Sequence, residues 1–228
     1  MKINIFGSTG IIGSKTLDLI NNYFPNIKVN LLCANNNINK LSLQINKYKP
    51  KYVYINNSSL VRDLISKTNS KTIILNYSDL KEYLINNNVN YSLLAISGYQ
   101  SLKYFEMILK NSESIGLVSK EAIVSAGHLF NKFSISKFKK IYPIDSEHFS
   151  IFKFINNKEY KNNIEKITLT ASGGPFLGYK YTDLKNISFK KASKHPKWKM
   201  GYKNSIDSAT LSNKCLELIE AHYLFNIP

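Results

Sequence analysis

Acidic side chains with a spacing suited to metal binding occur in the second half of the sequence. Asp145 and Glu147 stand two residues apart behind a strand-like apolar run at residues 141–144, so both carboxylates are expected on one side. Paired carboxylates, joined by a third from a distant part of a chain, are oxygen ligands that suit Mg²⁺ or Mn²⁺. The spacing therefore predicts part of a divalent-metal site.

A helix predicted over residues 208–224 offers a polar face to such a site. Asn213 and Glu217 are four residues apart and Lys214 lies three before Glu217, which places the three side chains on one face. An amide, an ammonium and a carboxylate beside further carboxylates suit a phosphate next to a metal, and the alternative is a solvated surface. The residues expected on the opposite, core face are Leu211, Cys215, Leu218 and His222.

Further polar candidates lie in turns and loops of the same half. Ser172 opens a Gly-Gly-Pro turn and Ser208 stands near the start of the last predicted helix, so both hydroxyls are available to a phosphate. His195 begins a loop that reads His-Pro-Lys-Trp-Lys-Met-Gly, where it is either structural or a ligand. Trp198, the only tryptophan, is either a packing plug or part of a lid that excludes water.

A glycine-rich loop near the N-terminus predicts nucleotide binding. Gly7, Gly10 and Gly13 directly follow a strand-like run and precede a helical pattern. In that context backbone N–H groups can approach a pyrophosphate at a helix N-terminus, and a tight turn without a ligand is the alternative. The segment Ala-Asn-Asn-Asn after the second predicted strand has no acidic group for a ribose 2′-hydroxyl, which favours NADP over NAD.

The elements that must position these residues alternate between strand and helix along the first 130 residues. Short apolar strands separated by helical stretches predict βαβ units and a parallel sheet covered on both faces. The strand candidates lie at residues 2–6, 27–33, 52–55, 72–75, 91–95 and 114–118. Later the pattern changes to strands at 141–144 and 164–170 with two longer helices, which predicts an α+β domain. We therefore expect domains at residues 1–130 and 141–228, joined by a linker over 131–140.

Composition and charge limit the class of protein. The 228 residues include 31 basic and 15 acidic ones, for a net charge of +16, and 43% are hydrophobic, which excludes a disordered polycation. Lysine, asparagine and isoleucine are overused together and share A/T-rich codons, so genomic base composition explains the charge better than nucleic-acid binding does. No apolar run approaches the roughly 18–20 residues of a membrane span, and neither a signal peptide nor a disulfide framework is indicated. We expect a cytoplasmic protein without membrane or nucleic-acid partners.

Six ordered motifs make the chain resemble the 1-deoxy-D-xylulose 5-phosphate reductoisomerase family. They are GSTGIIG at residues 7–13, SKEAIVSAG at 119–127, PIDSEHFSIF at 143–152, LTASGGPF at 169–176, HPKWKMG at 195–201 and DSATLSNKCLELIEAHYLF at 207–225. The agreement runs from residue 2 to residue 225. The resemblance implies an α/β fold with an N-terminal Rossmann-like NADPH-binding domain and a following α+β catalytic domain, and it implies that the family's C-terminal helical domain is missing.

The resemblance also implies roles for particular residues. The NADPH contacts that it implies are Thr9, Gly10, Ile11, Ile12, Asn35, Asn36, Asn37, Ser119, Glu121 and Gly201. The implied metal ligands are Asp145, Glu147 and Glu217. The implied substrate contacts are Lys120, Ser146, Glu147, Ser172, His195, Trp198, Ser208, Asn213, Lys214 and Glu217. The residues expected to act in catalysis are Lys120, Asp145, Glu147, His195 and Glu217.

By this resemblance the protein is an oxidoreductase of isoprenoid biosynthesis that uses NADPH and Mg²⁺ or Mn²⁺. It would convert 1-deoxy-D-xylulose 5-phosphate, a sugar phosphate, to 2-C-methyl-D-erythritol 4-phosphate, as a homodimer in the full-length family. Three positions on the cofactor side depart from the family's pattern: Ile11 replaces a serine, Ser119 an asparagine and Asn36 a basic residue. The alternatives are another NAD(P)-dependent sugar or semialdehyde dehydrogenase, which has no need of three carboxylates together, and a truncated inactive member of the family.

Overall fold

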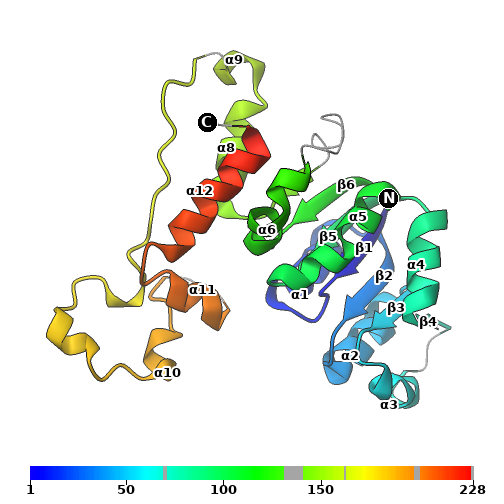
Figure 1. The fold of residues 1–228 in the computed structure, drawn as a ribbon. Coiled ribbons are helices and arrows are strands. Elements are labelled where there is room, and N and C mark those ends of the chain that lie inside the picture. Colours follow the sequence, from blue (N-terminus) through cyan, green and yellow to red (C-terminus); the bar gives the residue numbers. More distant parts are fainter. Residues whose placement is uncertain (69–70, 131–140, 162, 198–200, 227–228) are drawn as a thin grey trace. The chain divides into compact units, whose positions relative to one another are not determined.

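The first of two units in the chain carries a parallel sheet with a reversal in its strand order. The computed structural model describes residues 1–68, 71–130, 141–161, 163–197 and 201–226 (Figure 1). Its contacts divide into the units Met1–Ile144 and Asp145–Pro228. The described strands are β1 (Lys2–Phe6), β2 (Lys28–Ala34), β3 (Tyr52–Ile55), β4 (Ile73–Leu75), β5 (Val89–Leu94), β6 (Ser112–Leu117) and β7 (Ile141–Pro143). They form one sheet in the order β4-β3-β2-β1-β5-β6-β7, and every neighbouring pair is parallel.

This arrangement confirms the α/β prediction and locates the expected ligand edge. The chain moves outward from β1 to β4 and then returns to place β5 on the other side of β1. In open parallel sheets, ligands bind at the carboxyl ends of the strands where the order reverses. The glycine loop follows β1 directly and so lies at that point.

Helices cover both faces of the sheet. They are α1 (Ile11–Tyr23), α2 (Ile38–Tyr48), α3 (Val61–Ser66), α4 (Tyr77–Asn86), α5 (Leu102–Asn111) and α6 (Lys120–Phe130), with short 3-10 turns at Ser58–Leu60 and Tyr99–Ser101. Leu17 of α1 and Leu41 of α2 pack with Ile5 on one face. Successive strand residues point to opposite faces, so Phe6 turns to the other side, where its ring meets Tyr104 of α5. The alternation explains why short, wholly apolar strands suit this fold.

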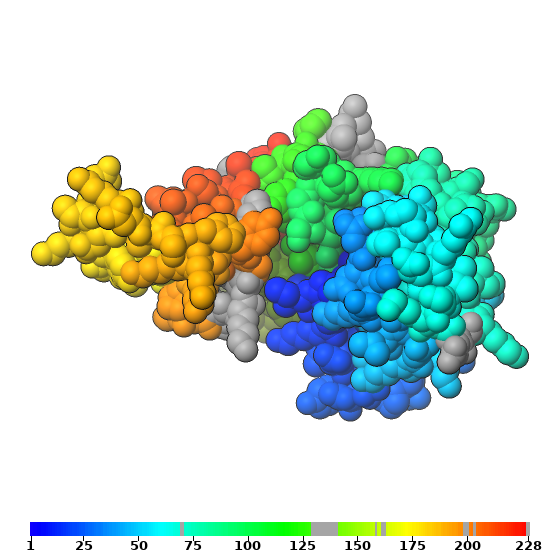
Figure 2. Space-filling model, turned by 90° about the horizontal axis from the view of Figure 1, so that it is seen from below, coloured from blue at the N-terminus to red at the C-terminus, as the bar shows by residue number. Residues whose placement is uncertain are grey.

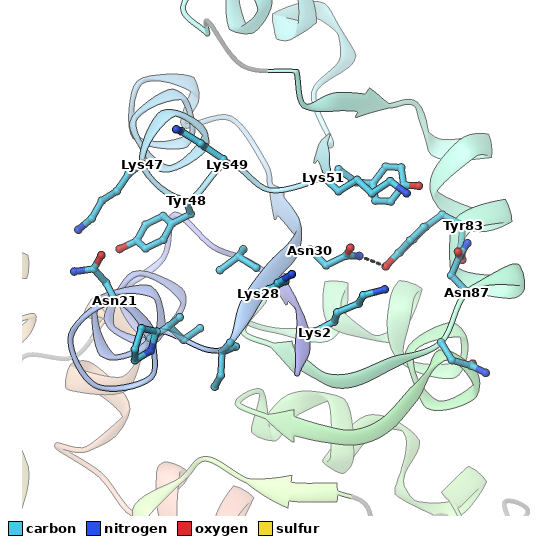
Figure 3. A pocket seen from close by; sticks show the side chains of 16 residues that line it. Lys2, Asn21, Lys28, Asn30, Lys47, Tyr48, Lys49, Lys51, Tyr83 and Asn87 are labelled. Atoms are coloured by element: carbon cyan, nitrogen blue, oxygen red, sulfur yellow. Dashed lines mark hydrogen bonds between the residues drawn. The ribbon is translucent and has the colours of Figure 1, made fainter.

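A chain of polar side chains is buried on the second of these faces. The Tyr83 hydroxyl donates to Oδ1 of Asn4 at 3.1 Å, and Nδ2 of Asn4 lies 3.3 Å from Oδ1 of Asn111. Nδ2 of Asn30 donates to the Tyr83 oxygen at 2.6 Å (Figure 3). Buried amides stabilise a fold only while they are paired, so this network fixes how α4 and α5 pack on β1.

Because the Tyr83 side chain is buried, we expect the free energy of unfolding to fall at alkaline pH. Burial raises the pKa of Tyr83 to about 12 from its usual 10, so the phenol loses its proton more readily in the unfolded chain. The resulting stabilisation is complete below pH 10 and is lost as the pH rises towards 12. We expect Tyr83→Phe to be less stable by about 1–3 kcal/mol at neutral pH, because Asn4 loses a donor and Asn30 loses the nearer of its two acceptors. The variant should also show a weaker alkaline loss.

Urea unfolding followed by circular dichroism between neutral pH and pH 11 measures both effects. Tyr23→Phe is the control, because the Tyr23 side chain is 69% exposed. An alkaline loss of the same size in the wild type and in Tyr83→Phe would show that another group is responsible.

A basic cleft lies at the opposite edge of the sheet from the glycine loop. Its volume is about 620 Å³, and it opens at the amino ends of β1, β2 and β3 (Figure 3). Its lysines are Lys2, Lys28, Lys47, Lys49 and Lys51, and no carboxylate is among the described residues that line it. Part of the lysine excess therefore gathers away from the edge at which a nucleotide is expected.

The second unit consists of helices and long loops in its described residues. The helices are α8 (Ser146–Ile155), α9 (Lys158–Lys161), α10 (Phe189–Ala192), α11 (Tyr202–Asp207) and α12 (Ser212–Phe225), with 3-10 turns at Gly174–Phe176 and Tyr181–Leu184. Figure 2 shows the segment between α9 and α10 in yellow, on the surface of its unit. Among the helices in the described part of the chain, none has the length and apolar composition that a membrane crossing requires.

Two expectations about strands change with the structure. The strand predicted over residues 164–170 does not form, because the described part of this unit holds no other strand with which it could pair. The strand predicted over residues 141–144 does form as β7, but it pairs with β6 in the first unit's sheet. Along the chain, the first unit ends at Ile144 and the second begins at Asp145. The predicted linker, 131–140, lies outside the described residues, and the domain limits 1–130 and 141–228 stay a prediction.

The face of α12 that is buried is the polar one, opposite to the apolar face predicted to be in the core. Leu211, just before the helix, and Leu218 are 72% and 65% exposed, and Cys215 and His222 are exposed as well. The buried residues of the helix are Glu217, Glu220 and Ala221. The prediction of an apolar core face was wrong because the carboxylates of α12 find polar partners inside the unit.

Candidate active site

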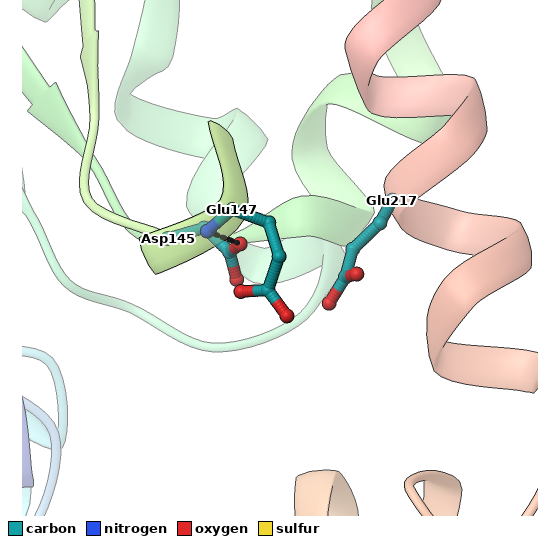
Figure 4. Close-up of side chains that lie close together, drawn as sticks. All are labelled: Asp145, Glu147 and Glu217. Atoms are coloured by element: carbon teal, nitrogen blue, oxygen red, sulfur yellow. Dashed lines mark hydrogen bonds between the residues drawn. The ribbon is translucent and has the colours of Figure 1, made fainter. Parts of the chain in front are cut away.

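Three carboxylates meet in the second unit. Each of Asp145, Glu147 and Glu217 offers an oxygen, and these atoms lie within 4.8 Å of one another (Figure 4). Asp145 is the N-cap of α8, and its Oδ1 accepts the Glu147 N–H at 3.2 Å. A helix cap, and not the side-chain alternation of a strand, therefore brings the first two together. Glu217 reaches them from the middle of α12.

A lysine lies between the carboxylates and offsets their repulsion. Lys214 Nζ is 2.6 Å from Oε1 of Glu147 and also donates to Glu217. Burial alone would lower the pKa of Lys214, but its hydrogen bonds to the two glutamates and their charges outweigh burial and raise it. Nδ2 of Asn213 donates to the other oxygen of Glu217 at 2.5 Å. The polar face predicted for this helix is thus assembled around Glu217, whose side chain is 1% exposed.

His148 and Glu220 are site residues that the sequence analysis missed. The His148 ring is fully buried, and its Nε2 lies 2.9 Å from the carbonyl oxygen of Glu217. Its Nδ1 lies 3.2 Å from Oδ1 of Asp145 and 3.4 Å from Oε2 of Glu220. Burial opposes a charge on this ring, but the Asp145 hydrogen bond and the Glu220 charge outweigh it and raise the pKa of His148. The available signal was spacing, because each new residue lies three positions after a predicted ligand.

His148 is expected to strengthen metal binding by orienting Asp145. Groups that orient metal ligands typically contribute a factor of about 10–100 in metal affinity. His148→Asn replaces the ring by a shorter, uncharged amide and removes the contact with the Glu217 carbonyl. Asp145 is then held less firmly, so we expect Mn²⁺ to bind about 10–100 times more weakly. Titration of Mn²⁺ by electron paramagnetic resonance measures this, with the exposed His222→Asn as control. Equal Mn²⁺ affinity in the two variants would contradict the assignment.

A double-glycine turn joins three of the predicted substrate residues. Gly174 has φ +69°, and a Cβ there would lie 2.3 Å from the carbonyl oxygen of Ser208, so only glycine allows this close approach. Just before the turn, Ser172 Oγ lies 2.9 Å from Nε2 of His195. The structure therefore brings the backbone of Ser208 and the side chains of Ser172 and His195 to one turn.

The protonation of His195 follows from its contacts. The backbone N–H of Lys197 donates to Nδ1 of His195 at 3.2 Å, which leaves Nε2–H as the donor to Ser172 in the neutral ring. Burial and the nearby Lys197 charge lower the pKa of His195, which favours that neutral form. Ser172 then accepts from His195, and its own hydroxyl hydrogen is directed to another acceptor, such as a phosphate oxygen.

A cavity of about 840 Å³ extends from Glu147, one of the three carboxylates, to Ser172 just before the turn. Ser146, Glu147, Ser172 and Lys197 line it together with residues 163–171 and part of α8. Ser146 Oγ is 2.5 Å from a Glu147 carboxylate oxygen. A ligand in this cavity can therefore contact the predicted metal ligand Glu147 and the predicted substrate residues Ser146 and Ser172.

In the first unit, the glycine loop leaves a helix N-terminus open. The N–H groups of Gly7 and Ser8 both donate to the Cys33 carbonyl at 2.9 Å, and the Gly10 N–H donates to the Gly7 carbonyl at 3.0 Å. Gly7 has φ +83°, and a Cβ there would lie 2.3 Å from the Ala95 oxygen. No side chain caps α1 at Gly10, and its first turn has no acidic residue. The leading N–H groups of a helix with these features form an anion site.

Protein-family models match both parts of the chain. A model described as 1-deoxy-D-xylulose 5-phosphate reductoisomerase matches residues 3–127, and a model of the C-terminal domain of that enzyme matches residues 141–225. The chain belongs to the 1-deoxy-D-xylulose 5-phosphate reductoisomerase family. The resemblance seen in the six motifs is thereby confirmed.

Individual reductoisomerases match over the whole chain but extend beyond it in length. The enzyme of Pelagibacter ubique (strain HTCC1062) is 43% identical, and the match covers 99% of this chain and 59% of that protein. The enzyme of Sulfurihydrogenibium sp. (strain YO3AOP1) is 41% identical, with coverage of 100% and 58%. A crystal structure of a reductoisomerase with NADPH, fosmidomycin and magnesium superposes with a TM-score of 0.87 at 33% identity, covering all of this chain and 59% of that one. The chain thus spans about three fifths of the length of these reductoisomerases.

The remaining residues expected to bind NADPH in a reductoisomerase lie mostly in the first unit. Asn35 and Asn37 follow β2, where Asn37 caps α2 and Oδ1 of Asn35 accepts from Asn56 at 3.0 Å. Ser119 Oγ lies 3.1 Å from a Glu121 carboxylate oxygen, so the structure brings these two together after β6. Ile11 is 56% exposed at the start of α1.

Two further predicted residues begin or precede helices in different units. Lys120 begins α6 in the first unit, whereas Gly201 precedes α11 in the second. Their expected meeting with the substrate and the cofactor therefore stays a prediction. Trp198 lies outside the described residues.

Proposed function

We propose that this chain supplies the NADPH- and metal-binding parts of an enzyme that isomerises and reduces 1-deoxy-D-xylulose 5-phosphate to 2-C-methyl-D-erythritol 4-phosphate, a step in isoprenoid synthesis. The observation that carries the proposal is the carboxylate trio of the second unit, in a chain of this family that also has an open glycine loop. The family's structure with NADPH, fosmidomycin and magnesium supports the same ligand classes. A general NAD(P)-dependent dehydrogenase accounts for the loop but not for the trio.

The donor set of the second unit suits a hard divalent cation. Asp145, Glu147 and Glu217 offer only oxygen, at spacings that one ion can span. Mg²⁺ or Mn²⁺, when bound, polarises ketone and hydroxyl oxygens as a Lewis acid. Asp145 is oriented for this role by His148, and Glu217 by Asn213.

The turn beside the trio suits the phosphate of the substrate. Ser172 is placed to donate its hydroxyl hydrogen, because neutral His195 supplies the hydrogen bond that its oxygen accepts. Ser208 packs against the same turn, and Lys214 adds a positive charge on the Glu147 side. Contacts to a phosphate remote from the reacting carbons orient the sugar and exclude water from it.

The carboxyl edge of the first unit suits the dinucleotide. Backbone N–H groups from Thr9 to Ile12 face the pyrophosphate in this proposal, and Asn36 with its neighbours lies towards the adenosine end. Bound NADPH supplies the hydride for the reduction. Ser119 and Glu121, held against each other after β6, are placed to orient the nicotinamide end.

Three finer points belong to the same proposal. Either manganese or magnesium can occupy the metal site, because the two ions share a preference for oxygen ligands. A homodimer is expected of the full-length protein by the family resemblance. Cytoplasmic location stays a prediction.

The test is NADPH oxidation after addition of 1-deoxy-D-xylulose 5-phosphate to chelator-treated protein, with and without Mn²⁺. We expect turnover that depends on the added metal. Turnover without metal would overturn the role of the trio. NADPH binding without turnover in any metal would favour another dehydrogenase or an inactive member of the family. Calorimetry with fosmidomycin separates these two, because only a reductoisomerase site should bind fosmidomycin in a metal-dependent way.

A further inference from the structure

A buried glutamine connects α2 to the glycine loop. Gln44 is only 7% exposed, although its helix neighbours Leu41 and Ile45 belong to the hydrophobic core. Its Nε2 donates to the carbonyl oxygen of Ser8 at 2.8 Å, across 36 residues of sequence. An amide in such surroundings is costly unless it forms hydrogen bonds. The reason for a buried glutamine at this position is therefore to be sought in the glycine loop, which its side chain contacts.

The bond fixes the direction of one peptide group in the loop. The Ser8 carbonyl also accepts the Ser14 hydroxyl at 3.1 Å, so donors from α2 and α1 hold it on the inner side. The peptide bond between Ser8 and Thr9 is trans. In a trans peptide the N–H points opposite to the C=O. Holding the Ser8 carbonyl inward therefore aims the Thr9 N–H outward, away from α2.

Packing alone does not account for the amide. Gln44 Oε1 and Ser8 Oγ are both buried and have no hydrogen-bond partner among the described residues. Gln44 thus makes one side-chain hydrogen bond and leaves its acceptor unpaired, which costs stability. An unbranched apolar side chain of the same length would fill the space without that cost. The unpaired oxygen therefore indicates that the donor serves the loop and not the core.

We propose that Gln44 is a positioning residue for the dinucleotide, which it serves by holding the Ser8–Thr9 peptide so that the Thr9 N–H faces the pyrophosphate. The inference rests on the proposed function, because it assumes that the loop binds NADPH. Gln44 itself does not touch the cofactor in this proposal. It acts through the backbone carbonyl of Ser8, to which its long side chain extends from α2.

The test compares Gln44→Met with Ser42→Ala. Methionine keeps the length and loses the donor. Ser42 is equally buried on the same helix, but its hydroxyl bonds within α2, to the Asn39 carbonyl at 2.9 Å. NADPH affinity is measured by the fluorescence of the bound cofactor, and thermal unfolding is measured in parallel. We expect Gln44→Met to bind NADPH about tenfold more weakly at an unchanged or higher melting temperature, and Ser42→Ala to bind as the wild type does.

Further measurements separate positioning from a general structural effect. Turnover at saturating NADPH should be unchanged in Gln44→Met, so that the loss appears in KM and not in kcat. Ser14→Ala removes the second donor to the same carbonyl at a half-buried position, and it should weaken NADPH binding by about threefold even if Gln44→Met fails to fold.

Two results would overturn the inference, and they differ in what else they affect. Wild-type NADPH affinity in folded Gln44→Met, or in Ser14→Ala where Gln44→Met does not fold, would remove the positioning role and leave the proposed function intact. A wild-type chain that does not bind NADPH would remove the cofactor part of the proposed function and this inference with it.

Discussion

Glu217→Gln is expected to lower metal-dependent turnover by about a thousandfold, the effect of losing about 4 kcal/mol of charge stabilisation. The Glu217 side chain is buried, and its two oxygens accept from Asn213 and Lys214. Glutamine has the same size but replaces one of these acceptors by a donor. One of the two existing donors then faces another donor, and the ion loses a charged ligand. Metal affinity should therefore fall together with turnover.

Mn²⁺ binding by electron paramagnetic resonance and NADPH oxidation measure the two effects separately. Glu159→Gln makes the same chemical change at an exposed position of α9 and should leave both unchanged. If Glu217→Gln kept wild-type Mn²⁺ affinity, the ion would have to bind elsewhere.

Gly13→Ala is expected to weaken NADPH binding by about a hundredfold or more. A Cβ at residue 13 would lie 2.3 Å from the Gly7 carbonyl oxygen and 2.7 Å from Cα of Ser8. Both contacts are with backbone, so the loop itself must move. The same Gly7 oxygen accepts the Gly10 N–H, and the movement therefore disturbs the N-terminus of α1. A displacement of about 1 Å in a positioning group typically costs a factor of about 10².

NADPH titration and Mn²⁺ titration of the same samples distinguish a local from a general effect. Mn²⁺ affinity should be unchanged in Gly13→Ala, because the carboxylate trio belongs to the second unit. Leu19→Ala, at an exposed position of α1, is the control for helix stability. NADPH binding equal to that of the control would show that the loop does not hold the cofactor.

Features set by short stretches of sequence could be predicted. The glycine loop was recognisable because Gly7, Gly10 and Gly13 stand between a strand and a helix, and the alternation of elements predicted the parallel sheet. Asp145 and Glu147 followed from their spacing. Glu217 could be assigned to the trio only through the family resemblance, because no local pattern connects it with α8.

Features set by distant partners could not be predicted. Glu220 is buried against His148, and Lys214 links buried Glu217 to Glu147, about 70 residues earlier in the chain, so hydrophobic periodicity indicated the wrong face. The strand at 164–170 has suitable residues, but a strand also needs a neighbour. Gln44 was missed because its role lies in a contact with the backbone, which no sequence pattern records.

Lys214 makes metal binding an exchange of one cation for another. Its ammonium already offers a positive charge to Glu147 and Glu217, so the second unit needs no ion to keep these carboxylates together. An arriving divalent ion competes with this charge and gains less than it would at three unpaired carboxylates. The ion should accordingly behave as a readily exchangeable cofactor: a chelator removes it without unfolding the protein, and occupancy follows the free metal concentration around the protein.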